Sequence, residues 1–361
     1  MKRAVCLVFL AFAACATAHA QEEAAAGVDV RATITGQFAA SSLLTQPGVN
    51  RSPATAGMRA VLYPTFKLSD HWTATAAWQL YTKPYFFDSF TQKETGAKGT
   101  LLQGTLNYSR VSDKGSLIAR AGMMSTAFGA FLLRYDDAEN PVIDLPQSYG
   151  YYYEPVTSLA VLATQIDATR GRFDGRVQIA NSSPANPRSV FARDQYGNWA
   201  GGAGLTIRQG FRVGVSGYRG PYLSRDYAYF FPGEANPNTQ IAHGLGADAQ
   251  WARGHWNVQG EFQRFAMPYK RIPTFREDVG YGEVRRVLHP RWYVAGRIGY
   301  KSATFGGTTT RYEFAAGYRP GRHELIKAGY QLNHHNTGSI ANDNTFAVQF
   351  ITTLHASRAV Q

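Results

Sequence analysis

Acidic side chains in one long segment are the residues of this chain whose chemistry is easiest to anticipate. Asp136, Asp137 and Glu139 lie within residues 125–156, and Arg134 stands just before them. A segment of this length between two regular elements is usually functional or disordered. Carboxylates at a narrow point of an aqueous passage attract cations and repel anions. The segment therefore predicts a charged constriction that filters ions and small polar solutes.

Basic side chains on neighbouring strands would supply the opposite charge. Polar–apolar alternation places five of them on the polar faces of predicted strands: Arg120, Arg176, Arg212, Arg297 and Lys327. Arg31 and Arg59 are further candidates, whose face the alternation does not fix. An acidic segment opposite a basic wall would create a transverse field that orients polar solutes.

Plainer structural roles are open for the same residues. Asp136 and Asp137 could cap a turn or bind a wall arginine. Each basic residue could belong to a hydrogen-bonded network of wall side chains instead of the constriction. The tyrosines among residues 149–153 could pack the base of the long segment or stack against sugars.

A period of two in the side-chain pattern predicts β-strands around these residues. From Trp256 to Gln263, apolar or small residues alternate with Asn, Gln and Glu. Successive side chains of a strand point to opposite faces, so this pattern gives one apolar and one polar face. The same pattern predicts about 16 strands along the chain, and membrane barrels of bacteria have an even number of strands. They are residues 28–38, 54–67, 72–82, 101–111, 116–124, 158–168, 172–180, 199–207, 211–218, 241–251, 256–266, 279–287, 292–301, 310–318, 324–333 and 344–354.

Short turns and longer connections alternate strictly between these strands. Trp251 and Trp256 lie on either side of one turn. Trp72 and Trp292 each begin a strand directly after another turn. Aromatic rings at strand ends, tight turns on one side and longer loops on the other are typical of transmembrane barrels. We predict an all-β fold, a transmembrane antiparallel barrel with the long third loop folded into its lumen. A periplasmic all-β protein is the alternative, because a soluble sandwich has the same period.

The first twenty residues have the three regions of a secretory signal peptide. Lys2 and Arg3 form a basic start, Ala4–Ala16 are apolar, and Ala18-His19-Ala20 is a cleavage site. Residues 1–20 are therefore a predicted signal peptide, and residues 21–361 are the predicted barrel. An attached lipid at Cys15 is a rival interpretation that the preceding residues do not favour.

Cysteine content and charge restrict the chemistry of the predicted mature chain. Both cysteines, Cys6 and Cys15, lie in the signal, which removes disulfides and thiol chemistry. Without Lys2 and Arg3, 37 − 2 = 35 basic residues stand against 25 acidic ones, a net charge of about +10. This excess favours the lipid bilayer, lipopolysaccharide and small hydrophilic or anionic solutes as partners. The basic residues are scattered, so nucleic acid is not an expected partner.

The whole predicted mature chain resembles a bacterial general porin, and more loosely the phosphate-selective porins. Phe128-Gly129, Tyr135-Asp136-Asp137 and Asn140-Pro141 in particular resemble the constriction loop of those proteins. The resemblance implies a passive, water-filled channel in the outer membrane of a Gram-negative cell, often a homotrimer. One departure is that Phe350 lies inside the last predicted strand, with Ala356 to Gln361 trailing beyond it. Porins often end with an aromatic residue that the assembly machinery recognises.

We expect a passive channel that prefers anions because of the positive charge of the chain, with no catalytic residue, cofactor or metal. A structural or adhesive barrel is the first alternative, and an outer-membrane lipid hydrolase is the second. Hydrolysis would need a Ser–His–polar constellation at the rim of the outer face, and no nucleophile elbow is found. His334 and His335 are adjacent and would point to opposite faces of a strand, which argues against a shared metal.

Overall fold

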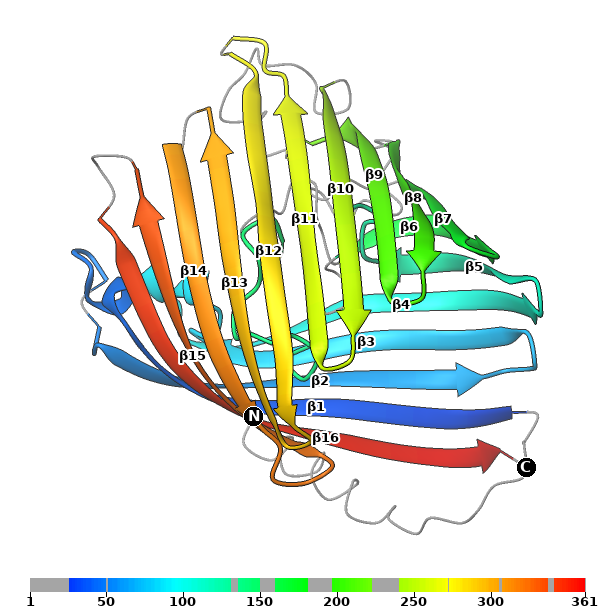
Figure 1. Cartoon of the computed structure of the whole chain (residues 1–361), viewed down its shortest axis with the longest axis horizontal. Coiled ribbons are helices and arrows are strands. Elements are labelled where there is room, and N and C mark those ends of the chain that lie inside the picture. The colour runs from blue at the N-terminus through cyan, green and yellow to red at the C-terminus, as the bar shows by residue number, and fades with distance from the viewer. Residues whose placement is uncertain are drawn as a thin grey trace.

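The computed structural model is a closed barrel of 16 antiparallel strands (Figure 1). It describes residues 26–49, 51–130, 136–149, 160–180, 197–222, 240–271, 273–304, 307–336 and 341–360. Each strand pairs with its neighbours in the sequence, and the first strand pairs with the last. The predicted all-β barrel is confirmed, since a sandwich would leave open edges where this sheet has none.

The strands follow the predicted positions closely, and most extend one to five residues further. Their bounds are β1 (Ala26–Ser41), β2 (Ala54–Lys67), β3 (Trp72–Lys83), β4 (Gly96–Ser112), β5 (Gly115–Met124), β6 (Val161–Arg170), β7 (Phe173–Ala180), β8 (Asn198–Arg208), β9 (Phe211–Pro221), β10 (Ile241–Arg253), β11 (Trp256–Met267), β12 (Phe275–His289), β13 (Trp292–Ala303), β14 (Gly307–Tyr318), β15 (Glu324–His335) and β16 (Asp343–Val360).

The barrel closes where β1 and β16 lie side by side, in blue and red in Figure 1. Their register runs unbroken from Ala26 opposite Val360 to Ser41 opposite Thr345. The expectation that Ala356 and its successors trail beyond the last strand is therefore wrong up to Val360. These residues have a partner strand in β1 that the sequence pattern alone could not identify, because the pairing joins opposite ends of the chain.

The two faces of the wall differ sharply in composition. Large apolar side chains such as Phe314, Ile298 and Val177 are exposed on the outer face. Side chains on the inner face are mostly buried and polar, among them Gln263, Gln349 and Thr35. An apolar outer surface around a polar interior is the composition expected of a barrel in lipid.

Connections of two kinds alternate at the two ends of the barrel. Two to five residues form the tight turns, for example 113–114 and 254–255. Most connections at the other end are longer, and two of these contain short 3-10 helices, η1 (Ser42–Thr45) and η2 (Phe87–Thr91). No helix in the described part of the chain is long and apolar enough to cross a membrane.

Aromatic pairs mark the turn end of the outer face. Trp72 packs edge-on against Tyr108 with ring centroids 5.3 Å apart, and Trp292 lies 4.4 Å from Tyr318. Both tryptophans open a strand directly after a tight turn. Amphipathic rings prefer the depth of lipid headgroups, so these pairs indicate where the apolar band of the barrel would end.

Arginine substitutions at two depths test which surface faces lipid. Ile298 lies in the middle of β13, and Phe173 is the first residue of β7; both side chains are exposed on the outer face. Ile298→Arg should destabilise the barrel by about 2–4 kcal/mol, and Phe173→Arg by about 0–1 kcal/mol, because the cost falls towards the interface. Denaturant unfolding in phospholipid vesicles measures both values, and equal losses would contradict this assignment of depth.

Candidate functional site: the third loop and the inner wall

Asp137 is the most extensively bound acidic residue of the long third loop. Its carboxylate accepts a charged hydrogen bond of 3.0 Å from Arg59 on β2. Thr35 on β1 and Tyr85 in the second loop each donate a further hydrogen bond of 2.9 Å. Asp137 is only 6% exposed and Arg59 only 1%. A carboxylate with three donors satisfies its lone pairs inside the protein, which offsets the cost of burying its charge.

Tyr85 contributes to this cluster as a donor. Burial and the neighbouring Asp137 carboxylate raise the pKa of the Tyr85 hydroxyl well above its ordinary value. The phenol therefore keeps its proton, and its hydrogen bond to Asp137 persists over the whole physiological pH range.

Asp136 and Glu139 have different surroundings from Asp137. Tyr63 on β2 donates to Asp136 over 2.5 Å, and the other Asp136 oxygen accepts from the Ala138 amide at 2.8 Å. Asp136 thus both caps a turn and binds the wall, as the plainer interpretation allowed. Glu139 is exposed. Arg134 lies outside the described residues.

Arg297 on β13 joins the loop to three neighbouring strands. It donates to Glu283 on β12 at 2.6 Å and pairs with Glu313 on β14 at 3.3 Å. It also donates to the Asn140 side chain and to the Asp144 carbonyl, both at 2.8 Å. Two carboxylates from neighbouring strands balance one fully buried guanidinium, and the loop supplies the remaining acceptors.

Lys327 on β15 binds the loop backbone directly. Its ammonium donates to the carbonyls of Asp137, Asn140 and Val142 at 2.8, 3.1 and 3.0 Å. These bonds use all three ammonium protons. Lys327 is fully buried. The side chain therefore fixes the path of the loop rather than facing it across open space.

Arg311 on β14 extends the same network towards the loop end of the barrel. It bonds Asp144 of the third loop at 3.1 Å and Asn333 on β15 at 2.8 Å. Asn333 in turn donates to Asp343 on β16 at 2.7 Å, and His335 contacts the same carboxylate at 2.9 Å. The described residues contain no group of three or more His, Cys, Asp or Glu that could hold a metal ion.

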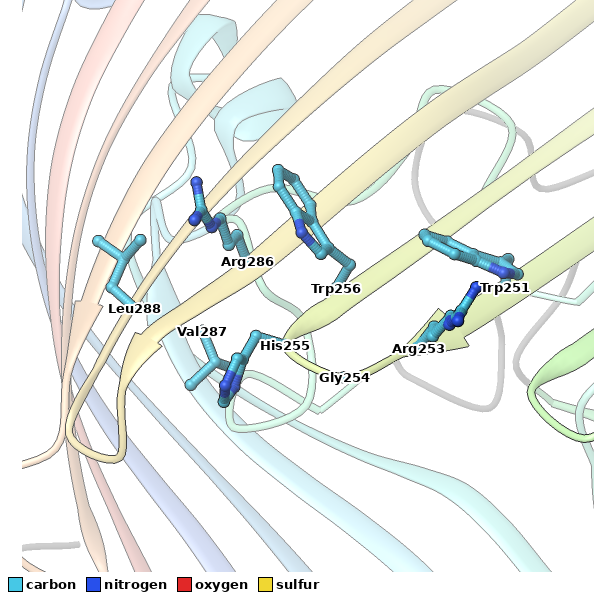
Figure 2. A pocket seen from close by; sticks show the side chains of 8 residues that line it. All are labelled: Trp251, Arg253, Gly254, His255, Trp256, Arg286, Val287 and Leu288. Atoms are coloured by element: carbon cyan, nitrogen blue, oxygen red, sulfur yellow. The ribbon is translucent and has the colours of Figure 1, made fainter.

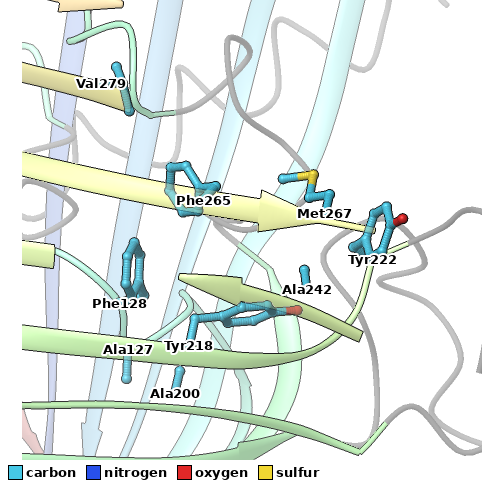
Figure 3. Close-up of a cluster of buried hydrophobic side chains, with 9 residues drawn as sticks. All are labelled: Ala127, Phe128, Ala200, Tyr218, Tyr222, Ala242, Phe265, Met267 and Val279. Carbon is cyan, nitrogen blue, oxygen red and sulfur yellow. The ribbon is translucent and has the colours of Figure 1, made fainter. Parts of the chain in front are cut away.

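The start of the third loop is attached to a different part of the wall by an apolar cluster (Figure 3). Ala127 and Phe128 pack against Tyr218 on β9, Phe265 on β11 and their neighbours. The Phe128 ring lies 5.5 Å from that of Phe265 and 6.4 Å from that of Tyr218. All of these side chains are buried, so the cluster anchors the loop by burial of apolar surface.

Gly129 follows this cluster at a point where no side chain fits. Its φ of 77° lies in the left-handed region, and a Cβ there would stand 1.8 Å from the Tyr149 hydroxyl. That hydroxyl donates to Glu261 on β11 at 2.5 Å, and the Ala130 amide donates to the same carboxylate at 3.0 Å. Tyr149 thus packs the base of the loop; the other tyrosines of residues 149–153 lie outside the described residues.

Three predicted basic residues lie along the strands β5 to β10. Arg120 on β5 pairs with Asp167 on β6 at 3.4 Å. Arg176 on β7 donates to the carbonyl of Gly129. Arg212 on β9 is bound by Asp174 on β7 at 2.6 Å and Asp248 on β10 at 2.7 Å. The structure thus brings Arg176, Arg297 and Lys327 against the third loop, whereas Arg120 and Arg212 pair with wall carboxylates.

Four residues that bind the third loop were not predicted from the sequence with an assigned position. Arg59 was a candidate without an assigned face, and Tyr63, Tyr85 and Arg311 were not singled out. Alternation within β14 signals an inward direction for Arg311 but not its partners, whereas within β2 it fixes the face of neither Arg59 nor Tyr63. Tyr85 lies in an irregular connection and gives no such signal.

The fold is shared with solved outer-membrane proteins of Gram-negative bacteria. The channel DcaP of Acinetobacter baumannii matches with a TM-score of 0.62 at 9% identity, over 94% of this chain and 100% of that one. An anion-selective porin from Comamonas acidovorans matches with a TM-score of 0.61 at 8% identity, over 91% and 100%. OmpT of Vibrio cholerae in its trimer form matches with a TM-score of 0.59 at 11% identity, over 91% and 100%. The chain therefore has the fold of the bacterial outer-membrane porins.

Sequence comparison identifies no family in addition to this similarity in fold. No protein-family model matches the chain. No curated protein matches it either.

Lys327→Met tests whether this ammonium holds the third loop. The substitution would leave three buried carbonyls without their donor, at about 1–3 kcal/mol each. We expect hydrogen exchange in the peptide covering residues 136–149 to rise at least about tenfold, while the strand amides stay protected. Lys301→Met is the matched control, because Lys301 pairs with Glu277 on the neighbouring strand. Similar exchange in both variants would contradict the assigned role.

Proposed function

We propose that the chain is a passive outer-membrane channel for small hydrophilic solutes and ions, narrowed by its third loop. The observation that supports this proposal is the set of bonds from charged residues of the polar wall to the third loop. A barrel of about 16 strands is wide enough to leave an aqueous channel. The loop would then set the width of the passage and the charge along it.

Contacts on opposite sides of the barrel support a path of the loop through the interior. Its first residues, 127–130, contact β7, β9 and β11. Residues 136–145 contact β1, β2, β13, β14 and β15. A single segment that touches strands this far apart in a closed sheet would cross the space between them.

Side-chain exposure separates a closed half of the wall from an accessible half. Arg297, Glu283 and Asp137 have side chains that are 0%, 2% and 8% exposed, respectively. The side chains of Arg120 and Arg212, in contrast, are 38% and 28% exposed. We infer that solutes pass along β5 to β10, with Arg120 and Arg212 lining the route. Arg176, Arg297 and Lys327 would hold the loop, and Glu139 is the loop carboxylate that a passing ion would meet.

The net positive charge of the chain is the basis of the proposed anion preference. Asp137 is paired with Arg59, and Asp136 is hydrogen-bonded to Tyr63, so their charges are partly balanced within the wall. Arg120 and Arg212 are paired with wall aspartates in the same way, so it is the excess of basic residues in the whole chain that would favour small anions in the passage. Lipid and lipopolysaccharide would surround the apolar band, and a homotrimer is the proposed assembly, as in the trimer form of Vibrio cholerae OmpT.

The hydrolase alternative has one geometric feature to consider. The Thr309 hydroxyl lies 3.0 Å from His335 Nδ1, and His335 Nε2 lies 2.9 Å from Asp343. This hydroxyl–imidazole–carboxylate chain is on the inner face, whereas a lipid substrate would approach the outer one. These hydrogen bonds also join β14, β15 and β16, so a structural role is enough to explain them. The structural or adhesive alternative predicts a folded barrel that passes no current.

Planar-bilayer recording of the refolded mature chain tests the channel directly. Stepwise currents are expected, because water and ions would pass beside the loop along β5 to β10. The reversal potential under a salt gradient should have the sign of an anion-preferring pore. A correctly folded, heat-modifiable barrel that stays silent would overturn the proposal in favour of the structural alternative.

Arg120→Gln tests which wall residues meet the permeating ion. Loss of this charge should lower the anion-to-cation permeability ratio about two- to fivefold, because a unit charge about 4 Å away is worth roughly 1 kcal/mol in water. Arg264→Gln is the matched control, since Arg264 also pairs with one aspartate, Asp278, but lies on the outer face. An equal shift in both variants, or none in Arg120→Gln, would remove Arg120 from the passage.

A further inference from the structure

Basic residues gather at the turn end of the barrel. Each of the seven tight turns carries at least one, in the turn itself or on the strand residue that enters it. They are Lys67 and His71, Lys114, Arg170 and Arg172, Arg208, Arg253 and His255, His289 and Arg291, and Arg319, Arg322 and His323. Only Asp70 and Asp113 are acidic among the turn residues. The turn end of the barrel is therefore surrounded by positive charge.

One of these turns forms a hollow on the outer surface (Figure 2). It lies between β10, β11 and the end of β12 and has a volume of about 420 Å³. Trp251 and Trp256 bracket the turn, Arg253 and Arg286 contribute guanidinium groups, and Leu288 is an apolar edge. The hollow thus combines two cations with two indoles and an aliphatic side chain.

The strand register explains how these groups come together. Arg253 on β10 is paired with Trp256 on β11, and Trp256 is paired with Arg286 on β12. The three side chains form one row on the outer face, with the indole between the two arginines. Neighbouring strands are about 4.8 Å apart, so the two arginine backbones are separated by about 10 Å. Arginine side chains are long, so both guanidinium groups can turn towards one anionic group at the edge of the indole.

Stacking orients one of the two cations. The Arg286 guanidinium carbon lies 4.8 Å from the Trp256 ring centroid. A guanidinium held over an indole keeps its edge donors available for a bidentate anion such as phosphate. No acidic residue lines the hollow, and within the described part of the chain neither Arg253 nor Arg286 forms an ion pair with a carboxylate.

The hollow lies at the level where the apolar band of the outer surface ends. Val258 and Val284, two residues further from the turn on the same face, continue into the apolar band. Trp292 and Tyr318 mark the same level on β13 and β14. A molecule bound here would place its charged part at the arginines and any apolar part against the valines.

We propose that this hollow binds the headgroup of an anionic glycerophospholipid in the leaflet at the turn end of the barrel. Arg253 and Arg286 bind the phosphate, and the glycerol and first acyl carbons contact Trp251, Trp256, Val258 and Val284. A soluble phosphate would use only the arginines, whereas a lipid uses both the cations and the adjoining apolar surface. The inference rests on insertion of the barrel in a membrane, as proposed above, but not on an open pore.

Native mass spectrometry of the intact barrel in detergent tests this site. The probes are phosphatidylglycerol, phosphatidylcholine with the same acyl chains, and glycerol phosphate as the headgroup alone. Phosphatidylglycerol should bind the unaltered barrel most tightly. The double variant R253Q/R286Q should lose about tenfold or more of that affinity, since each basic residue near an anionic lipid surface contributes about 1 kcal/mol. R291Q/R322Q removes the same charge from two other turns and should lose less than about threefold.

The outcomes separate this site from the channel itself. Equal loss in R253Q/R286Q and R291Q/R322Q would overturn the site and leave only a diffuse basic surface. Equal binding of glycerol phosphate and phosphatidylglycerol would overturn the lipid assignment. Heat-modifiable migration confirms that each variant is folded, and conductance is recorded separately. Lipid binding by a silent barrel would therefore refute the channel and not the site, and the reverse result would refute the site alone.

Discussion

Pairing of β1 with β16 is the constraint on which the remaining structure depends. Sixteen residue pairs join the two ends of the chain, from Ala26 and Val360 to Ser41 and Thr345. A sheet edge in lipid would leave backbone donors and acceptors without partners, at several kcal/mol for each group. Closure removes both edges and creates an enclosed interior. The third loop contacts strands that are distant from one another in this closed sheet.

Charged side chains of the strands hold the third loop, and the burial of each charge is compensated. Asp137 has three donors, Lys327 has three carbonyl acceptors, and Arg297 lies between Glu283 and Glu313. Removing one member of such a group leaves another charge buried without its partner, which costs more than the intact pair contributes. The network therefore specifies one position of the loop more strongly than it stabilises the barrel. Phe128 and its apolar neighbours supply the hydrophobic part of the attachment.

Basic residues of this chain have three distinct surroundings. Arg297 and Lys327 are buried and bind the loop, whereas Arg120 and Arg212 remain partly exposed on the wall. Arg253 and Arg286 lie on the outer surface beside Trp256. The net charge of the chain alone does not distinguish these three groups of basic residues. Their surroundings support three separate proposed roles: fixing the third loop, lining the passage in ion pairs with wall aspartates, and binding anionic headgroups.

The strands, their alternation and the long third loop could be predicted from the sequence, because a period of two and tight turns are local properties of the chain. Asp136, Asp137, Arg297 and Lys327 could likewise be identified as charged residues of the loop and the polar wall. Their partners depend on the tertiary structure, since Asp137 meets Arg59 across 78 residues and Lys327 meets the loop carbonyls across 185 to 190. Closure of the sheet brings these residues together in space. The alternation along one strand carries no information about which strand lies opposite.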